Sequence, residues 1–141
     1  MASKVAAVGA LGVALFPCSC GGHSETVPHV HFASAAVMFL ILAYFCYMFY
    51  KRARGKGHTE ANRRAFVYAA SGLAIIASIS ALVIDTLSDE ALTAAIPRLV
   101  YYCERASLVA FGVSWLTASR IFPFLTRSDE RFSLLSASPN L

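Results

Sequence analysis

Residues 65–84 read AFVYAASGLAIIASISALVI and carry no charge over 20 positions. A second run, residues 32–50, carries no charge over 19 positions. About 20 apolar residues in a helix cover the roughly 30 Å hydrocarbon core of a bilayer, so each run is long enough to cross it. A helix in a water-soluble protein needs polar residues along its outer face, and neither run has such a face. Both runs therefore predict membrane-spanning helices.

The composition of the whole chain agrees with this interpretation. Of 141 residues, 57% are hydrophobic and 14% are charged, whereas soluble domains are about 25% charged. The net charge of +4 and the pI near 9.0 do not indicate a nucleic-acid partner, because the basic residues flank the apolar runs and are not interleaved with aromatic residues on a polar scaffold. In that position they favour an anionic membrane surface, so membrane lipids are the predicted partner.

Two weaker segments lie outside these runs. Residues 99–119 form a further apolar stretch, interrupted by Glu104 and Arg105. Near the amino terminus, residues 5–16 form an apolar run of about 12, with Lys4 before it and Pro17 after it. Three interpretations of this short run are a signal-peptide core, an interfacial segment, and the second half of a longer crossing helix. A membrane segment is favoured, because no Ala-x-Ala cleavage site follows.

The predicted fold class is therefore all-α, an integral membrane helical bundle with about four membrane segments, the first one short. The membrane domain is expected over residues 1–120. Residues 121–141 are expected to form a cytoplasmic tail that lies in the interface or is disordered.

The distribution of basic residues predicts the orientation. The loop at residues 51–64 carries six Lys or Arg and one acid, Glu60, whereas residues 85–97 carry only acids. Short loops rich in Lys and Arg stay in the cytoplasm. With this loop inside, ten of the twelve basic residues are cytoplasmic. We therefore predict a multi-pass inner-membrane protein with both termini in the cytoplasm.

Helix packing is predicted from small residues, which let two helices approach closely. In residues 65–84 the small stripe is Ala70, Ala74, Ala77, Ser78 and Ala81, and in the last segment it is Ser107, Ala110, Ser114 and Thr117. These two stripes are expected to meet, with Tyr68, Ile75, Ile79 and Leu82 facing lipid.

The loop after the first segment gathers potential metal ligands. The candidates, all within 14 positions, are Cys18, Cys20, His23, His29 and His31, with Glu25 among them. Thiolates with imidazoles suit zinc or copper. The spacing matches no standard zinc module, so an irregular outer loop with hydrogen-bonding residues is the alternative, as is a disulfide that includes Cys103.

A second polar group is predicted inside the membrane. Glu104 and Arg105 lie about one and a half turns into the last segment, and a charge there is costly unless it is paired or faces a cavity. The side chains expected to converge with them near the outer leaflet are His31, Ser34 and Asp85. This cluster is interpreted as a structural clamp that holds helices in register. The functional alternative is a site for a proton, an ion or a lipid headgroup.

Three stretches carry a resemblance to known sequences: residues 9–17, residues 31–46 and, most specifically, residues 104–116, which read ERASLVAFGVSWL. Together they resemble a group of uncharacterised bacterial integral membrane proteins without an established activity. Longer members have further hydrophobic sequence upstream, which implies that the first segment here is the end of a longer helix. A weaker similarity is to membrane hydrolases of the ceramidase and adiponectin-receptor type, but a third histidine on a distant helix is missing.

No catalytic residue is assigned from the sequence, and enzyme activity is left open. The leading hypothesis is a scaffold or partner-binding membrane protein, acting as a homo-oligomer or with a partner membrane protein. The alternatives are a metal-dependent, lipid-processing membrane enzyme at the outer leaflet and a small transporter subunit.

Overall fold

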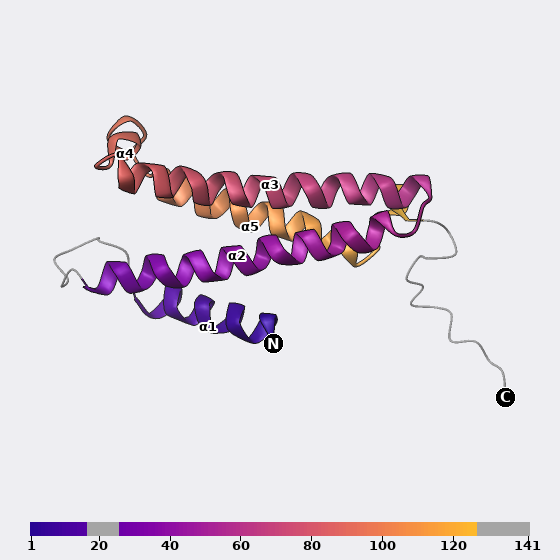
Figure 1. The fold of residues 1–141 in the computed structure, drawn as a ribbon, viewed down its shortest axis with the longest axis horizontal. Coiled ribbons are helices and arrows are strands. Elements are labelled where there is room, and N and C mark those ends of the chain that lie inside the picture. The colour runs from indigo at the N-terminus through magenta and orange to yellow at the C-terminus, as the bar shows by residue number, and fades with distance from the viewer. Residues whose placement is uncertain (17–25, 127–141) are drawn as a thin grey trace.

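The computed structural model describes residues 1–16 and 26–126, and every regular element in them is a helix, which confirms the predicted all-α class. Figure 1 shows the chain as a bundle of long, nearly parallel rods. In chain order the elements are α1 (Ala2–Leu15), α2 (Thr26–Arg54), α3 (Thr59–Leu87), α4 (Ala91–Ala95), α5 (Leu99–Ala118) and the 3-10 turn η1 (Pro123–Leu125).

The bundle is built on the antiparallel pair α2 and α3. Each has 29 residues, about 44 Å at 1.5 Å per residue. Helix α5 packs mainly on α3, and α1 packs on α2, while α2 and α5 touch only lightly. Because α1 has 14 residues, about 21 Å of helix, it covers only part of α2 (Figure 1).

Two of the helices, Pro28–Arg54 and Thr59–Leu87, are long and apolar enough to cross a membrane by length and composition. Helix α1 is apolar but shorter. The charge-free runs of the sequence lie inside α2 and α3, and the helices continue past them at both ends. The number of crossings, predicted as about four, stays a prediction for α1 and α5.

A short hairpin joins α2 to α3 at the basic end of the bundle. Lys51, Arg52 and Arg54 occupy the last turn of α2, where positive charge is favourable beside the carbonyl end of the helix dipole. Gly57 has φ +71°, a left-handed conformation that glycine adopts without steric penalty. His58 then caps α3, because its Nδ1 accepts a hydrogen bond from the Ala61 amide at 3.2 Å.

The buried core is a thin layer between α2 and α3. Its main cluster is Ala35, Phe39, Leu42, Ala43, Cys46 and Ile75. A second cluster of Ala53, Ala65 and Tyr68 lies at the basic end. Gly72 packs closely on α2, because an added Cβ there would lie 3.3 Å from the Cys46 Cβ.

The predicted packing face of α3 is wrong. Ala70, Ala74 and Ala77 are exposed, whereas Tyr68 and Ile75, expected to face lipid, are buried. The buried face instead follows Ala61, Ala65, Ser71 and Ile75. This face also brings Gly72 against α2. Residues 65–84 are apolar all round, so small residues on one side do not determine which side of the helix is buried. On α5 the prediction is confirmed for Ser107, Ser114 and Thr117, which are buried.

Candidate functional site

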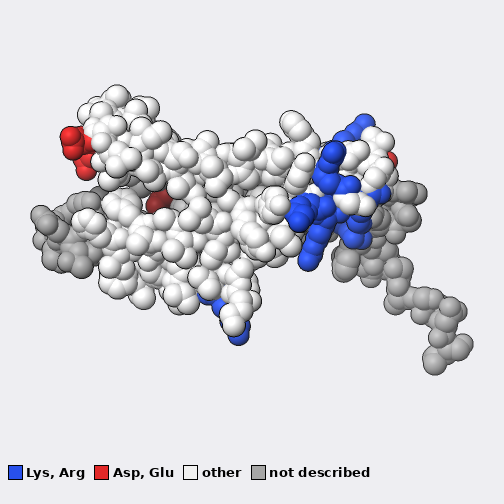
Figure 2. Space-filling model, in the orientation of Figure 1, with Lys and Arg blue, Asp and Glu red and all other residues white. Residues whose placement is uncertain are grey.

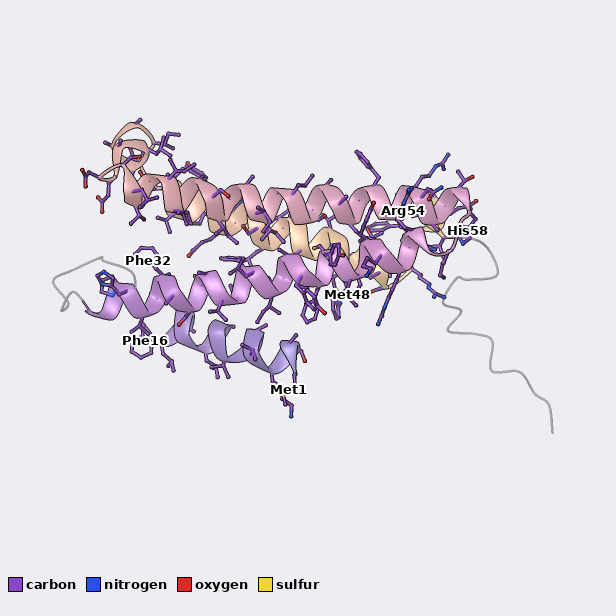
Figure 3. The ribbon with its side chains drawn as sticks, in the orientation of Figure 1. Met1, Phe16, Phe32, Met48, Arg54 and His58 are labelled. Carbon is purple, nitrogen blue, oxygen red and sulfur yellow. The ribbon has the colours of Figure 1, made fainter. Side chains whose placement is uncertain are left out.

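His31 is a polar side chain at the end of the bundle opposite the α2–α3 hairpin, and it contacts both Phe16 and Glu104. It lies in the second turn of α2 and is 6% exposed. Its Nδ1 is 2.7 Å from the main-chain oxygen of Phe16, which follows α1. A carbonyl oxygen only accepts hydrogen bonds, so Nδ1 carries a proton and donates. Phe16 and Phe32 mark this end in Figure 3, and Arg54 and His58 mark the other.

The other ring nitrogen of His31 faces α5. Its Nε2 is 3.5 Å from Oε1 of Glu104, within ion-pair range but long for a hydrogen bond. Glu104 is part-buried, with 27% of its side chain exposed. Each of the two side chains thus has a polar partner across the helix interface, which lowers the cost of placing it in apolar surroundings.

Asp85 is buried at the last turn of α3, but its carboxylate bonds elsewhere. Its Oδ1 accepts from the Thr93 amide at 2.9 Å, and its Oδ2 accepts from the Thr93 hydroxyl at 2.5 Å. Thr93 belongs to α4, so both carboxylate oxygens hold the connection between α3 and α5. The prediction placed Asp85 beside His31, whereas the structure bonds its carboxylate to Thr93.

The other two members of the predicted polar cluster lie apart from the His31–Glu104 pair. Ser34 lies on the face of α2 that packs against α1, in direct contact with Gly9 and Gly12. Arg105 is exposed on α5. The structure thus places together one pair of the five predicted residues.

The predicted metal site falls mostly on residues 17–25, so Cys18, Cys20 and His23 lie outside the described residues. His29 is exposed, and both ring nitrogens of His31 already face a partner. Within residues 1–16 and 26–126, no three His, Cys, Asp or Glu side chains are grouped as metal ligands would be. Zinc or copper binding by the loop stays a prediction.

Sequence reasoning treated the basic loop only as a marker of orientation and missed a cavity beside it. The cavity has a volume of about 200 Å³ and lies among α2, α3 and the end of α5. Its walls are formed by Phe49, Arg52, Ala53, Lys56, Arg64, Tyr68, Ala118 and Arg120. The spacing of Arg64 and Tyr68, four residues apart on one helix face, was the available signal.

The family model described as "Protein of unknown function (DUF998)" matches residues 1–114. The chain belongs to this family. The DUF998 match includes His31, Asp85 and Glu104 and ends within α5. It confirms the predicted resemblance to a group of uncharacterised proteins. No curated protein and no solved structure is similar enough to this DUF998 chain to count as a match.

Proposed function

We propose that this DUF998 protein is a multi-pass integral membrane protein with a non-catalytic role, as a scaffold that binds a partner membrane protein or a second copy of itself. Four membrane segments, α1, α2, α3 and α5, form the bundle. The hairpin end faces the cytoplasm and the α4 end faces the opposite side.

The observation that carries the membrane placement is the concentration of charge toward the two ends of the bundle. Lys and Arg gather where α2 meets α3, and acidic side chains lie at the α4 end (Figure 2). Between these ends many large apolar side chains are exposed, among them Phe66, Leu73 and Val109 at 75%, 69% and 59%. Large exposed apolar areas are unfavourable in water and favourable against lipid tails.

The scaffold role is supported by where the polar side chains within the helices bond. Ser107 and Thr117 each donate to a carbonyl oxygen one turn earlier in α5, at 2.8 Å. His31 joins the end of α1 to α5, and Asp85 bonds Thr93. The Ser107 and Thr117 bonds stay within α5, where each of these hydroxyls is paired with a carbonyl oxygen of its own helix. The contacts of His31 and Asp85 connect elements of the bundle, as expected for groups that stabilise the assembly of helices.

Orientation is tested with a reporter that is active only outside the cytoplasm. A fusion after Gly57 should be silent and a fusion after Asp89 should be active, because the basic hairpin stays inside. The reverse pattern would overturn the orientation. The same state at both positions would overturn the crossing by α3.

The scaffold role is tested by comparing membrane abundance with the phenotype of a deletion strain. We expect Glu104→Gln and Asp85→Asn to fail to rescue the deletion strain only to the extent that less folded protein is present in the membrane. A variant that reaches wild-type abundance but does not rescue the deletion strain would instead favour an enzyme or a proton site. Stoichiometric zinc or copper in the purified protein would favour the metal-dependent enzyme.

A further inference from the structure

The cavity at the hairpin end has a strongly basic lining. Arg52 comes from the end of α2 and Lys56 from the hairpin that follows it. Arg64 comes from the start of α3, and Arg120 from the residues after α5. Arg64 is only 4% exposed. None of the described residues that line the cavity is acidic. Four cationic side chains from different parts of the chain therefore surround one space.

The rest of the cavity wall combines the aromatic rings of Phe49 and Tyr68 with two alanines, Ala53 and Ala118. The Phe49 and Tyr68 rings lie 5.5 Å apart, and Phe49 also contacts Trp115 at 6.1 Å. Tyr68 additionally lines an apolar groove between α2 and α3, formed with Leu40, Tyr44, Gly72, Leu73 and Ile76. A basic cavity beside an apolar groove is complementary to a phospholipid, which has a charged headgroup and apolar chains.

Arg120 brings the fourth cation of the lining from beyond α5. It follows the helix at Ser119 and has φ +59°. Glycine is the usual residue at such a left-handed position after a helix, because a Cβ atom is disfavoured there. Asp89, Glu90 and Arg98 also have positive φ, so this conformation alone assigns no role. The contribution of Arg120 to the site is its side chain, which lines the cavity.

We propose that this cavity binds a phosphate oxyanion, as the headgroup of an anionic phospholipid or as a free phosphate. Arg and Lys side chains make charge-assisted hydrogen bonds to phosphate oxygens, and basic pockets between membrane helices on the cytoplasmic side suit anionic headgroups. The volume is several times the roughly 30 Å³ that one water occupies, so a phosphate group fits. The lipid source rests on the membrane placement proposed above; the phosphate chemistry does not.

The experiment uses the full chain in a neutral detergent and measures thermal stability during titration. The probes are phosphatidylglycerol, zwitterionic phosphatidylcholine and inorganic phosphate. The cavity variant is Arg52→Gln with Arg120→Gln. The control is Arg54→Gln with Arg63→Gln, which removes the same charge from two exposed residues of the same end that do not line the cavity.

We expect phosphatidylglycerol to raise the melting temperature of the wild type and the control, with little effect of phosphatidylcholine. The cavity variant should need at least about tenfold more phosphatidylglycerol, since it loses two charged hydrogen-bond donors. Protection of the wild type by inorganic phosphate alone, lost in the cavity variant, would identify a free anion as the source.

If the cavity variant and the control lost protection by phosphatidylglycerol equally, the inference would be overturned, because equal losses would indicate general attraction to a basic surface. Absence of protection by any probe would also overturn it. The reporter fusions at Gly57 and Asp89 do not depend on these variants. A correct topology without phosphate protection therefore rejects the cavity proposal alone, and phosphate protection with a reversed topology rejects the proposed orientation alone.

Discussion

Gly12 of α1 lies directly against Ser34 of α2, close enough that a Cβ atom at Gly12 would lie 2.7 Å from the Ser34 Cβ. Gly9, one turn earlier, makes a similar approach, with its would-be Cβ 3.2 Å from the Met38 Cβ. The two glycines are what let α1 pack along α2. Contacts between Cβ atoms cannot be relieved by a side-chain rotation, so the backbones would have to separate.

Gly12→Ala is therefore expected to weaken the packing of α1 on α2. Overpacking of this kind costs about 1–3 kcal/mol, which should lower the melting temperature of the purified protein in detergent. Gly112→Ala on α5 is the matched control, because its Cβ would meet open space, and it should be neutral or stabilising. Equal destabilisation by both would contradict the close approach at Gly12.

The buried face of α3 is tested by a pair of adjacent residues. Ile75 is fully buried in the main cluster and Ala74 is exposed. Ile75→Ala should cost about 2–5 kcal/mol through lost contacts and a cavity, whereas Ala74→Leu should be tolerated. Thermal stability of the two variants in the same detergent decides between them. Tolerance of Ile75→Ala with loss of folding for Ala74→Leu would restore the face predicted from sequence.

The His31–Glu104 pair is tested by substitutions that remove one partner at a time. Glu104→Gln should keep most of the stability, because the amide can donate to Nε2 of a neutral imidazole. Glu104→Ala should lose more, about 1–3 kcal/mol, since the imidazole is left without that partner. His31→Ala should lose the most, because it also removes the donor to the Phe16 oxygen. Wild-type stability of all three variants would exclude a clamp.

The left-handed backbone at Arg120 predicts an unusual order of stability. Arg120→Gly removes the steric conflict of a Cβ atom at φ +59°, whereas Arg120→Ala retains it. The glycine variant should be more stable than the alanine variant by about 1 kcal/mol, measured as a difference in melting temperature without added lipid. Because both variants lack the guanidinium, this comparison isolates the backbone contribution. An alanine variant as stable as the glycine variant would contradict it.

Much of the fold was predictable because charge-free runs determine where α2 and α3 lie. The basic residues at 51–64 likewise identified the hairpin end. Which side of α3 is buried was not predictable, because apolar residues occur on all sides of that helix and their spacing does not mark one face. The His31–Glu104 contact was among the expected pairings, since both residues are polar in apolar segments. The Asp85–Thr93 contact was missed because α4 is too short to leave a sequence pattern, and the basic cavity depends on how three helix ends meet.

The length of α2 and α3 has a consequence for the membrane around the protein. In the proposed placement, each helix of 29 residues is about 14 Å longer than the roughly 30 Å hydrocarbon core. Their charge-free runs of 19 and 20 residues account for about that core thickness, so the remaining turns stand in the headgroup layers. The bilayer then needs neither thinning nor helix tilt to accommodate this pair. The protein would therefore fit a bilayer of ordinary thickness and disfavour a much thicker one.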